Sequence, residues 1–301
     1  MLLRGHHPGQ AILGGHIGFG ALLDCLASAL HDDIGRLTGG QHQELLAATA
    51  LTFLSIKSFA GFCTNRDDDG QPLDGYLIGL HDGLYSRLKL RAKAFVADSL
   101  EGDLAVHKGN SRTSYEVATE FFLLPRSELL DHIDLADVPP ELAGILASVQ
   151  SDAAIIVMQF VALHEFGHVA ANDFALMDRY KFHLGDNNGN PARPPATQDF
   201  WDTEFRADES VLRWLASADR TPESHWTNFA MVHGFFVWLA DIETRLGGPL
   251  CPLHPPPVTR GRRLLSTMAA LVPPNEHAHR AISWVERAIA SWRDPTRRPA
   301  A

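Results

Sequence analysis

The 301-residue chain has few cysteines and no excess of positive charge. Its three cysteines, Cys25, Cys63 and Cys251, are odd in number and far apart, so a disulfide-stapled scaffold and a closely spaced zinc or redox pair are excluded. The formal charge is −10, from 26 basic and 36 acidic residues, which argues against a general nucleic-acid binder or a membrane-surface protein. A reducing, cytoplasmic location is the natural expectation.

The sequence also lacks a convincing membrane-spanning run. A span needs about 20 predominantly apolar residues. Residues 11–30 come closest, but His16 and Asp24 interrupt them and glycine is frequent. No internal repeat and no low-complexity tract is present. We therefore expect a soluble globular protein with one large core or two modest ones.

Histidine, in contrast, is abundant, with 16 residues. Two of them belong to residues 164–168, which read H-E-F-G-H. Positions i and i+4 share one face of an α-helix, so His164 and His168 can bind a single metal ion. The carboxylate of Glu165 lies beside them, where a general base is needed. This H-E-x-x-H pattern is typical of zinc hydrolases.

The surrounding residues favour a buried helix. The run 153–163 is apolar nearly all round and contains no proline or glycine. Ser151 and Asp152 are plausible caps for its start, and Asn172 and Asp173 for its end. Buried polar groups must be paired. A metal ion would therefore explain two histidines and a glutamate on such a helix.

Two acidic residues lie further along the chain, on a second helix that the amphipathic pattern predicts from Trp201 to Leu215. Glu204 and Asp208 are also spaced i, i+4, so they share a face. A catalytic zinc takes three protein ligands and a water, and Glu204 would be the third ligand. Asp208 would then accept the free N–H of a ligand histidine. Asp208 is also the main rival for the ligand position.

A three-histidine site of the metzincin kind is excluded. Its longer motif needs a glycine three residues after the second histidine and a third histidine three residues later. Ala171 and Phe174 occupy these positions.

A third motif lies near the C-terminus, where residues 254–260 read H-P-P-P-V-T-R. Together, H-E-x-x-H, the E-F-x-A-D of residues 204–208 and this H-P-P-x-x-x-R resemble the soluble catalytic core of the CAAX-prenyl-protease and HtpX-type gluzincin peptidases. The resemblance covers about residues 150–265. Those enzymes are membrane proteins, and the chain departs from them in having no expected span. A weaker similarity to the phage-exclusion Lit-type peptidases rests on the first motif and its mid-chain position.

The gluzincin resemblance implies one Zn²⁺ per chain on His164, His168 and Glu204. It also implies Glu165 as the general base and a supporting role for Asp208. For the last motif it implies a role of His254 or Arg260, near the substrate or in the structure. His254 is accordingly the first candidate for a second catalytic residue that donates to the oxyanion, followed by Tyr180 and His183 on proximity.

The expected fold is mainly α with a small β-sheet (α+β), built around a zincin-like core with H-E-x-x-H on a buried central helix. Residues 1–140 are expected to form a mostly helical region of unknown role packed on the catalytic region, residues 141–293, with a disordered tail at 294–301. Residues 115–124 are the best strand candidate, as an edge strand to which an extended substrate adds. Residues 184–199 are expected to form a loop bordering the cleft. The predicted helices are 17–34, 41–61, 77–99, 127–134, 139–150, 200–219, 225–246, 257–272 and 275–292.

These patterns predict a zinc-dependent endopeptidase that acts on a protein or peptide substrate and binds no nucleic acid. The alternative is a zinc-stabilised binding, regulatory or defence protein that keeps the site without turnover. A water in the fourth zinc position supports the first, and a fourth protein ligand supports the second.

Overall fold

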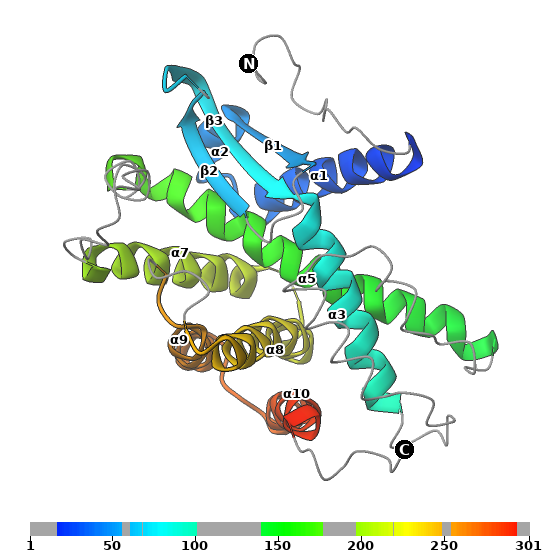
Figure 1. The fold of residues 1–301 in the computed structure, drawn as a ribbon. Helices are drawn as coiled ribbons and strands as arrows, with labels where there is room; N and C mark the ends of the chain where they lie inside the picture. Colours follow the sequence, from blue (N-terminus) through cyan, green and yellow to red (C-terminus); the bar gives the residue numbers. More distant parts are fainter. Residues whose placement is uncertain are drawn as a thin grey trace.

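The computed structural model describes residues 17–55, 61–67, 69–100, 140–176, 197–218, 220–248 and 254–293. Over these ranges it combines helices with one three-stranded sheet (Figure 1), which confirms the expected mainly helical α+β class. The elements are α1 (Ile17–Leu37), α2 (Gln43–Ala47), β1 (Thr49–Leu54), β2 (Gly61–Arg66), β3 (Pro72–His81), α3 (Asp82–Leu100), α5 (Pro140–Ala171), α7 (Thr197–Ser217), α8 (Pro222–Leu246), α9 (Pro257–Leu271) and α10 (Glu276–Arg293).

The strands are ordered β1-β3-β2, with β1 parallel and β2 antiparallel to the central β3. Ile78 of β3 pairs with Leu51 on one side and Cys63 on the other, and all three side chains are buried. The sheet lies against α5, with α1 next to β1 (Figure 1). Among the described strands, β2 is therefore an edge strand beside α5.

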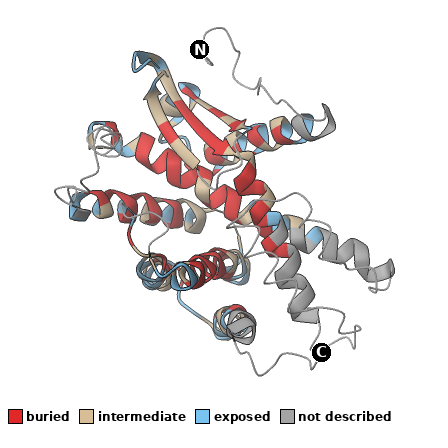
Figure 2. Ribbon diagram, viewed as in Figure 1, coloured by how far each residue is buried: buried red, intermediate tan, exposed pale blue. Residues whose placement is uncertain are grey.

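Helix α5 runs through the centre of the protein, between the sheet and helices α7 and α8, and its middle and C-terminal parts are buried (Figure 2). The predicted start at Ser151 and Asp152 is wrong. The helix begins at Pro140 and includes the separate helix expected at 139–150. Proline suits a first helical position, and nothing at Ser151 or Asp152 breaks the hydrogen-bond pattern.

One stretch of α5, Ser151–Ala171, is long and apolar enough to cross a membrane by composition, and it is the single such stretch among the described residues. In the protein, 78% of its most apolar window is buried inside the fold. Such burial gives a core helix the same apolar composition as a span, so composition alone is weak evidence for a membrane.

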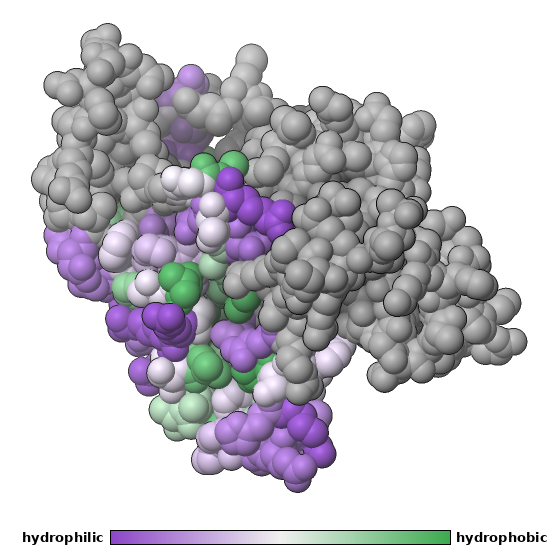
Figure 3. All heavy atoms as spheres, turned by 60° about the horizontal axis from the view of Figure 1, so that its bottom comes forward, coloured by the Kyte–Doolittle hydropathy of each residue, from purple (hydrophilic) through white to green (hydrophobic). Residues whose placement is uncertain are grey.

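The C-terminal helices form the layer on the other side of α5. Helix α7 packs on α5 and α9, and α8 packs on α5, α9 and α10. Thr221 caps the start of α8 by accepting the N–H of Ser224, and Gly247 ends it in the left-handed conformation. In a view that brings the α10 side forward, hydrophilic and hydrophobic side chains are interspersed over the described atoms (Figure 3).

The helices predicted for this layer are confirmed to within a few residues, whereas the helix predicted at 41–61 is wrong. That range holds the short α2 and the strand β1 instead. Thr49, Leu51 and Phe53 point inwards and alternate with less buried residues, which is a strand pattern. Residues 77–81 likewise end β3, and the predicted helix 77–99 is confirmed from Asp82 onwards as α3. Pairing with β3, distant in sequence from β1, decides the conformation of residues 49–54.

Several predicted segments lie outside the described residues: the strand 115–124, the helix 127–134, the tail 294–301, and the loop 184–199 up to residue 196. Residues 197–199 belong to α7. The division of the chain at residue 140 stays a prediction.

Candidate metal centre

The first requirement of the site is a close contact between α5 and α7, and Gly167 makes it possible. A Cβ atom at Gly167 would lie 3.2 Å from the Cα of Ala207 and 3.3 Å from its Cβ. The missing side chain lets the two helices approach at the turn between His164 and His168. The same contact brings Glu204 of α7 beside both imidazoles.

The sequence-predicted ligand residues converge in this contact. The Nε2 atoms of His164 and His168 lie 3.2 Å apart. The Glu204 carboxylate lies 3.3 Å from His164 Nε2 through Oε2, and 3.4 Å from His168 Nε2 through Oε1. All three side chains are buried. Within the described ranges they are the one group of histidine, cysteine or carboxylate residues whose ligand atoms are close enough to hold a metal ion.

The carboxylate of Glu204 fits a cation. Its Oε2 atom is buried and makes no hydrogen bond with any described residue, although Nη1 of Arg260 and Nδ1 of His254 each lie 3.4 Å away. These longer contacts offset only part of the hydration that a buried charged oxygen loses. A metal ion bound between Glu204 and the two imidazoles would satisfy it.

Asp208 holds the other nitrogen of His164. Its Oδ1 atom lies 3.0 Å from His164 Nδ1, on the opposite side of the ring from Glu204. Arg260 of α9 holds Asp208 in a bidentate salt bridge, in which Nε donates to Oδ2 at 2.8 Å and Nη2 donates to Oδ1 at 2.7 Å. Nη2 of Arg260 also lies 3.4 Å from His164 Nδ1, farther away than Asp208. Because the nearer group is a carboxylate, which can only accept, His164 Nδ1 donates to it and Nε2 is left to bind a metal.

A comparable contact on His168 was not anticipated from the sequence. His168 Nδ1 donates to Asp173 Oδ2 at 2.9 Å, and Arg206 of α7 donates to the other oxygen of Asp173. The sequence predicts Asp173 only as part of the end of the helix and predicts no role for Arg206. The available signal was an acidic residue five positions after the second histidine of the motif.

Glu165 lies on the sheet side of the metal-centre cluster, the group formed by His164, His168, Glu204 and the side chains that contact them. Its side chain is buried, and a Cβ built on Gly61 at the start of β2 would lie 3.4 Å from its Oε1 atom. The same Cβ would lie 3.0 Å from Val161 of α5. A glycine at this position therefore lets the edge strand approach α5 and Glu165 closely.

His254, from the segment before α9, closes the cluster on the solvent side. Its Nδ1 atom lies 3.4 Å from Glu204 Oε2, and its side chain remains 44% exposed. The ring of Phe200 contacts it with centroids 5.8 Å apart. His254 is thus the accessible member of the cluster. Tyr180 and His183, the other predicted donors, lie outside the described residues.

The charged groups of the metal-centre cluster shift one another's pKa values. Burial opposes protonation of His168, but hydrogen bonds to Asp173 and Glu204 outweigh it and raise its pKa to about 10. For His164, burial is likewise outweighed by the charges of Glu204 and Asp208, and its pKa is raised. A metal bound through these nitrogens must displace protons.

The pKa values of the acidic residues shift in the opposite direction. Burial would raise the pKa of Glu204, yet the charges of His254 and His164 lower it well below its ordinary value. The pKa of Asp208 is also lowered, because Arg260 outweighs the burial of its carboxyl group. In turn, Asp208 raises the pKa of Arg260 against the effect of burial. Both acids are ionised at neutral pH, as metal ligation and hydrogen bonding to a ligand histidine require.

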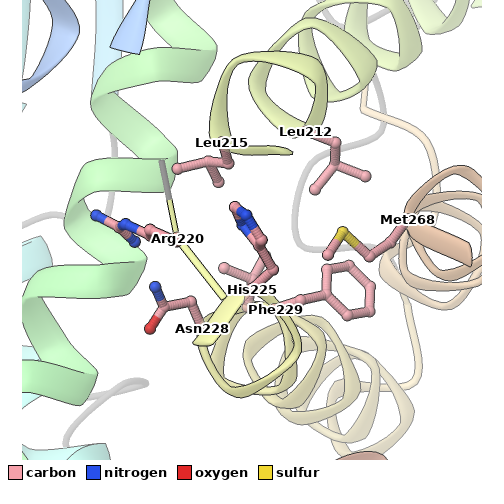
Figure 4. A pocket seen from close by; sticks show the side chains of 8 residues that line it. Leu212, Leu215, Arg220, His225, Asn228, Phe229 and Met268 are labelled. Atoms are coloured by element: carbon pink, nitrogen blue, oxygen red, sulfur yellow. The ribbon is translucent and has the colours of Figure 1, made fainter. Parts of the chain in front are cut away.

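A separate pocket lies further along α7, between the C-terminal part of that helix, α8 and α9 (Figure 4). Leu212, Leu215, Phe229 and Met268 form its apolar wall, and His225 points into it. It has room for about one water molecule. None of the residues in the metal-centre cluster lines it.

Comparison with protein-family models, curated proteins and solved structures finds no match for this chain. The arguments for its function therefore come from its own residues.

Proposed function

We propose that the protein is a zinc-dependent endopeptidase in which His164, His168 and Glu204 bind the metal and Glu165 is the general base. The observation that carries the proposal is the convergence of two buried imidazoles and one buried carboxylate next to a second buried glutamate. The resemblance of the three motifs to gluzincin peptidases points to the same activity.

The spacing of the ligand atoms supports zinc. Zinc binds nitrogen and carboxylate oxygen at about 2.0–2.2 Å in a tetrahedron, whose edges are then about 3.3–3.6 Å long. The three ligand-to-ligand distances are 3.2, 3.3 and 3.4 Å, although the two measured to Glu204 end on different oxygens. Three protein ligands also leave a fourth position for substrate or water, as in catalytic zinc sites.

A bound zinc ion would supply Lewis acidity and lower the pKa of its water towards about 7. Glu165 would take the proton of the attacking water on a carboxylate oxygen and pass it to the leaving amine. Its buried position beside His164 and His168 suits this task. Arg260 and Asp208 would hold His164 in the ligand tautomer throughout.

The substrate is proposed to be an extended peptide bound along β2. This edge strand begins next to Glu165, and main-chain hydrogen bonds to such an edge are a general way to bind peptides. In that arrangement the peptide carbonyl would come between β2 and the metal. His254, accessible and next to Glu204, is the best placed described side chain to donate to the oxyanion.

The test compares wild type with Glu165→Gln on a mixture of peptides, with cleavage products identified by mass spectrometry. The variant should keep one zinc per chain and lose about 10²- to 10⁴-fold in cleavage rate, the usual contribution of a general base. Glu209→Gln is the matched control, because Glu209 pairs with Arg263 on the exposed side of α7. Equal cleavage by wild type and Glu165→Gln would refute the assignment of the base.

A metal centre without turnover is the second candidate, and the position of His254 favours it. A small movement of its imidazole would make Nδ1 a fourth ligand and close the site. The coordination of the zinc-loaded protein separates the two candidates. Three histidine nitrogens and no exchangeable water would identify a structural site, whereas two histidine nitrogens and a water would support the peptidase.

A further inference from the structure

Helix α5 ends in a turn with a specific hydrogen-bond pattern. The N–H of Asp173 donates to the carbonyl of His168 at 3.1 Å, and the N–H of Asn172 donates to the carbonyl of Val169 at 3.1 Å. Asn172 has a φ of 54°, and it is the one non-glycine residue with positive φ among the described residues. These features define a Schellman motif, in which the residue after the left-handed one folds back over the last helical turn.

The motif brings Asp173 onto His168. In most such turns the residue in the place of Asp173 makes an apolar contact with the residue in the place of His168 or its neighbour. Here a carboxylate and an imidazole make that contact, with Oδ2 2.9 Å from Nδ1. Both side chains are buried.

Arg206 ties this contact to α7. Its guanidinium donates to Oδ1 of Asp173, so both oxygens of the carboxylate have partners. Arg206 lies two residues after Glu204 and is itself half-exposed. The turn at the end of α5 is thus fixed to the helix that carries the acidic ligand.

The contact selects a tautomer of His168. Because the Asp173 carboxylate can only accept, Nδ1 keeps its hydrogen, and Nε2 is the nitrogen that gives up its proton when a metal binds. Nε2 is also the atom nearest His164 Nε2 and Glu204 Oε1. With the other tautomer, a hydrogen on Nε2 would occupy the place of the metal.

We infer that Asp173 is a positioning residue that prepares His168 for metal binding, held in place by the Asn172 turn and by Arg206. This inference rests on the proposed metal centre. It gives each ligand histidine its own carboxylate, Asp208 for His164 and Asp173 for His168.

The test measures zinc affinity by competition with a chromophoric chelator in wild type and Asp173→Asn. The amide can turn its NH₂ group towards Nδ1 and so favour the wrong tautomer. Zinc affinity should fall about 10- to 100-fold, the usual effect of removing such a partner. Ring ¹⁵N shifts of His168 in the zinc-loaded protein should show a hydrogen on Nδ1 and the metal on Nε2 in wild type, and a loss of this pattern in Asp173→Asn, which a purely structural role would not cause.

A control variant shows that the effect is specific to Asp173. Asp202→Asn makes the same chemical change on the exposed face of α7 and should leave zinc affinity unchanged. If Asp173→Asn does not fold, Asn172→Val takes its place. A β-branched residue disfavours positive φ and displaces Asp173 without removing it, so affinity should again fall.

The outcomes separate this inference from the proposed function. Wild type that binds one zinc, together with a folded Asp173→Asn of equal affinity and unchanged His168 tautomer, overturns the role of Asp173 and leaves the metal centre standing. Wild type that binds no zinc overturns both.

Discussion

Among the described residues, two regions bury a histidine against a carboxylate, and one of the two resembles a metal centre. In the metal-centre cluster, His164 and His168 direct their Nε2 atoms to a common point with Glu204. Between α8 and α10, His233 directs Nε2 to Glu286 at 3.2 Å, while its Nδ1 is buried without a hydrogen bond to any described residue. Convergence of several ligand atoms, rather than burial of a histidine, marks the metal site.

The partners of the two histidine groups differ as well. Asp208 and Asp173 are buried, and each is held by an arginine from another element, Arg260 or Arg206. Glu286, the partner of His233, is 53% exposed. In a histidine that binds a metal, the ring nitrogen that faces away from the metal is held by a hydrogen bond. An isolated buried histidine needs no such support.

The largest expected effect is on metal content. His168→Gln removes one of three ligand atoms and should abolish stoichiometric zinc binding, measured by elemental analysis after dialysis. His233→Gln makes the same chemical change at an equally buried site and should retain one zinc per chain. Retention of full zinc content by His168→Gln would remove the distinction between the two regions.

The next effect concerns the arginines of α9. Arg260→Met leaves Asp208 and Glu204 buried without the guanidinium that contacts both, and should cost about 3–5 kcal/mol of unfolding free energy. Arg263→Met on the same helix removes a half-exposed partner of Glu209 and should cost about 0–1 kcal/mol. Chemical denaturation of the two metal-free variants measures both values. Similar losses of unfolding free energy in the two variants would show that the buried ion pairs of the metal-centre cluster contribute no more to stability than an exposed ion pair.

The pKa of His168 predicts an opposite pH dependence for stability and for metal affinity. In the folded, metal-free chain this pKa is raised from 6.5 to about 10. The resulting stabilisation is fully present below pH 6.5 and is lost as pH rises through about 10. Thermal unfolding of the chelated protein should therefore move to lower temperature over that interval, while zinc affinity rises as protons leave. An increase in the stability of the chelated protein over the same interval would contradict the assignment.

The smallest expected effect comes from the helix contact. Gly167→Ala places a methyl group against Ala207 and should cost about 1–3 kcal/mol by overpacking, offset by about 1 kcal/mol of helix propensity. Zinc affinity should fall because α7 carries Glu204 away from the imidazoles. Gly248→Ala, where the new methyl meets no atom within 4 Å, is the matched control. Calorimetry and chelator competition measure the two effects.

The parts of the site that follow helical periodicity could be predicted from the sequence. His164 and His168 share a face by their spacing, and so do Glu204 and Asp208, so one helix contact brings the four together. Asp173 could not be found in this way, because its position depends on the left-handed turn at Asn172 rather than on a repeat.

The fold also has parts that the sequence pattern predicts and parts that it does not. The helices of the C-terminal layer, α7 to α10, were predicted from their amphipathic patterns and breakers. β1 was mistaken for part of a helix, because its conformation depends on pairing with β3, which lies more than twenty residues later. The approach of Gly61 to Glu165 depends on this same sheet and carries no local signal.

Anomalous diffraction from crystals of the zinc-loaded protein at the zinc absorption edge tests the central claim most directly. We predict one strong peak per chain, within about 2.0–2.2 Å of Nε2 of His164, Nε2 of His168 and a carboxylate oxygen of Glu204. No peak at this position, or a peak bound by other residues, would contradict the account.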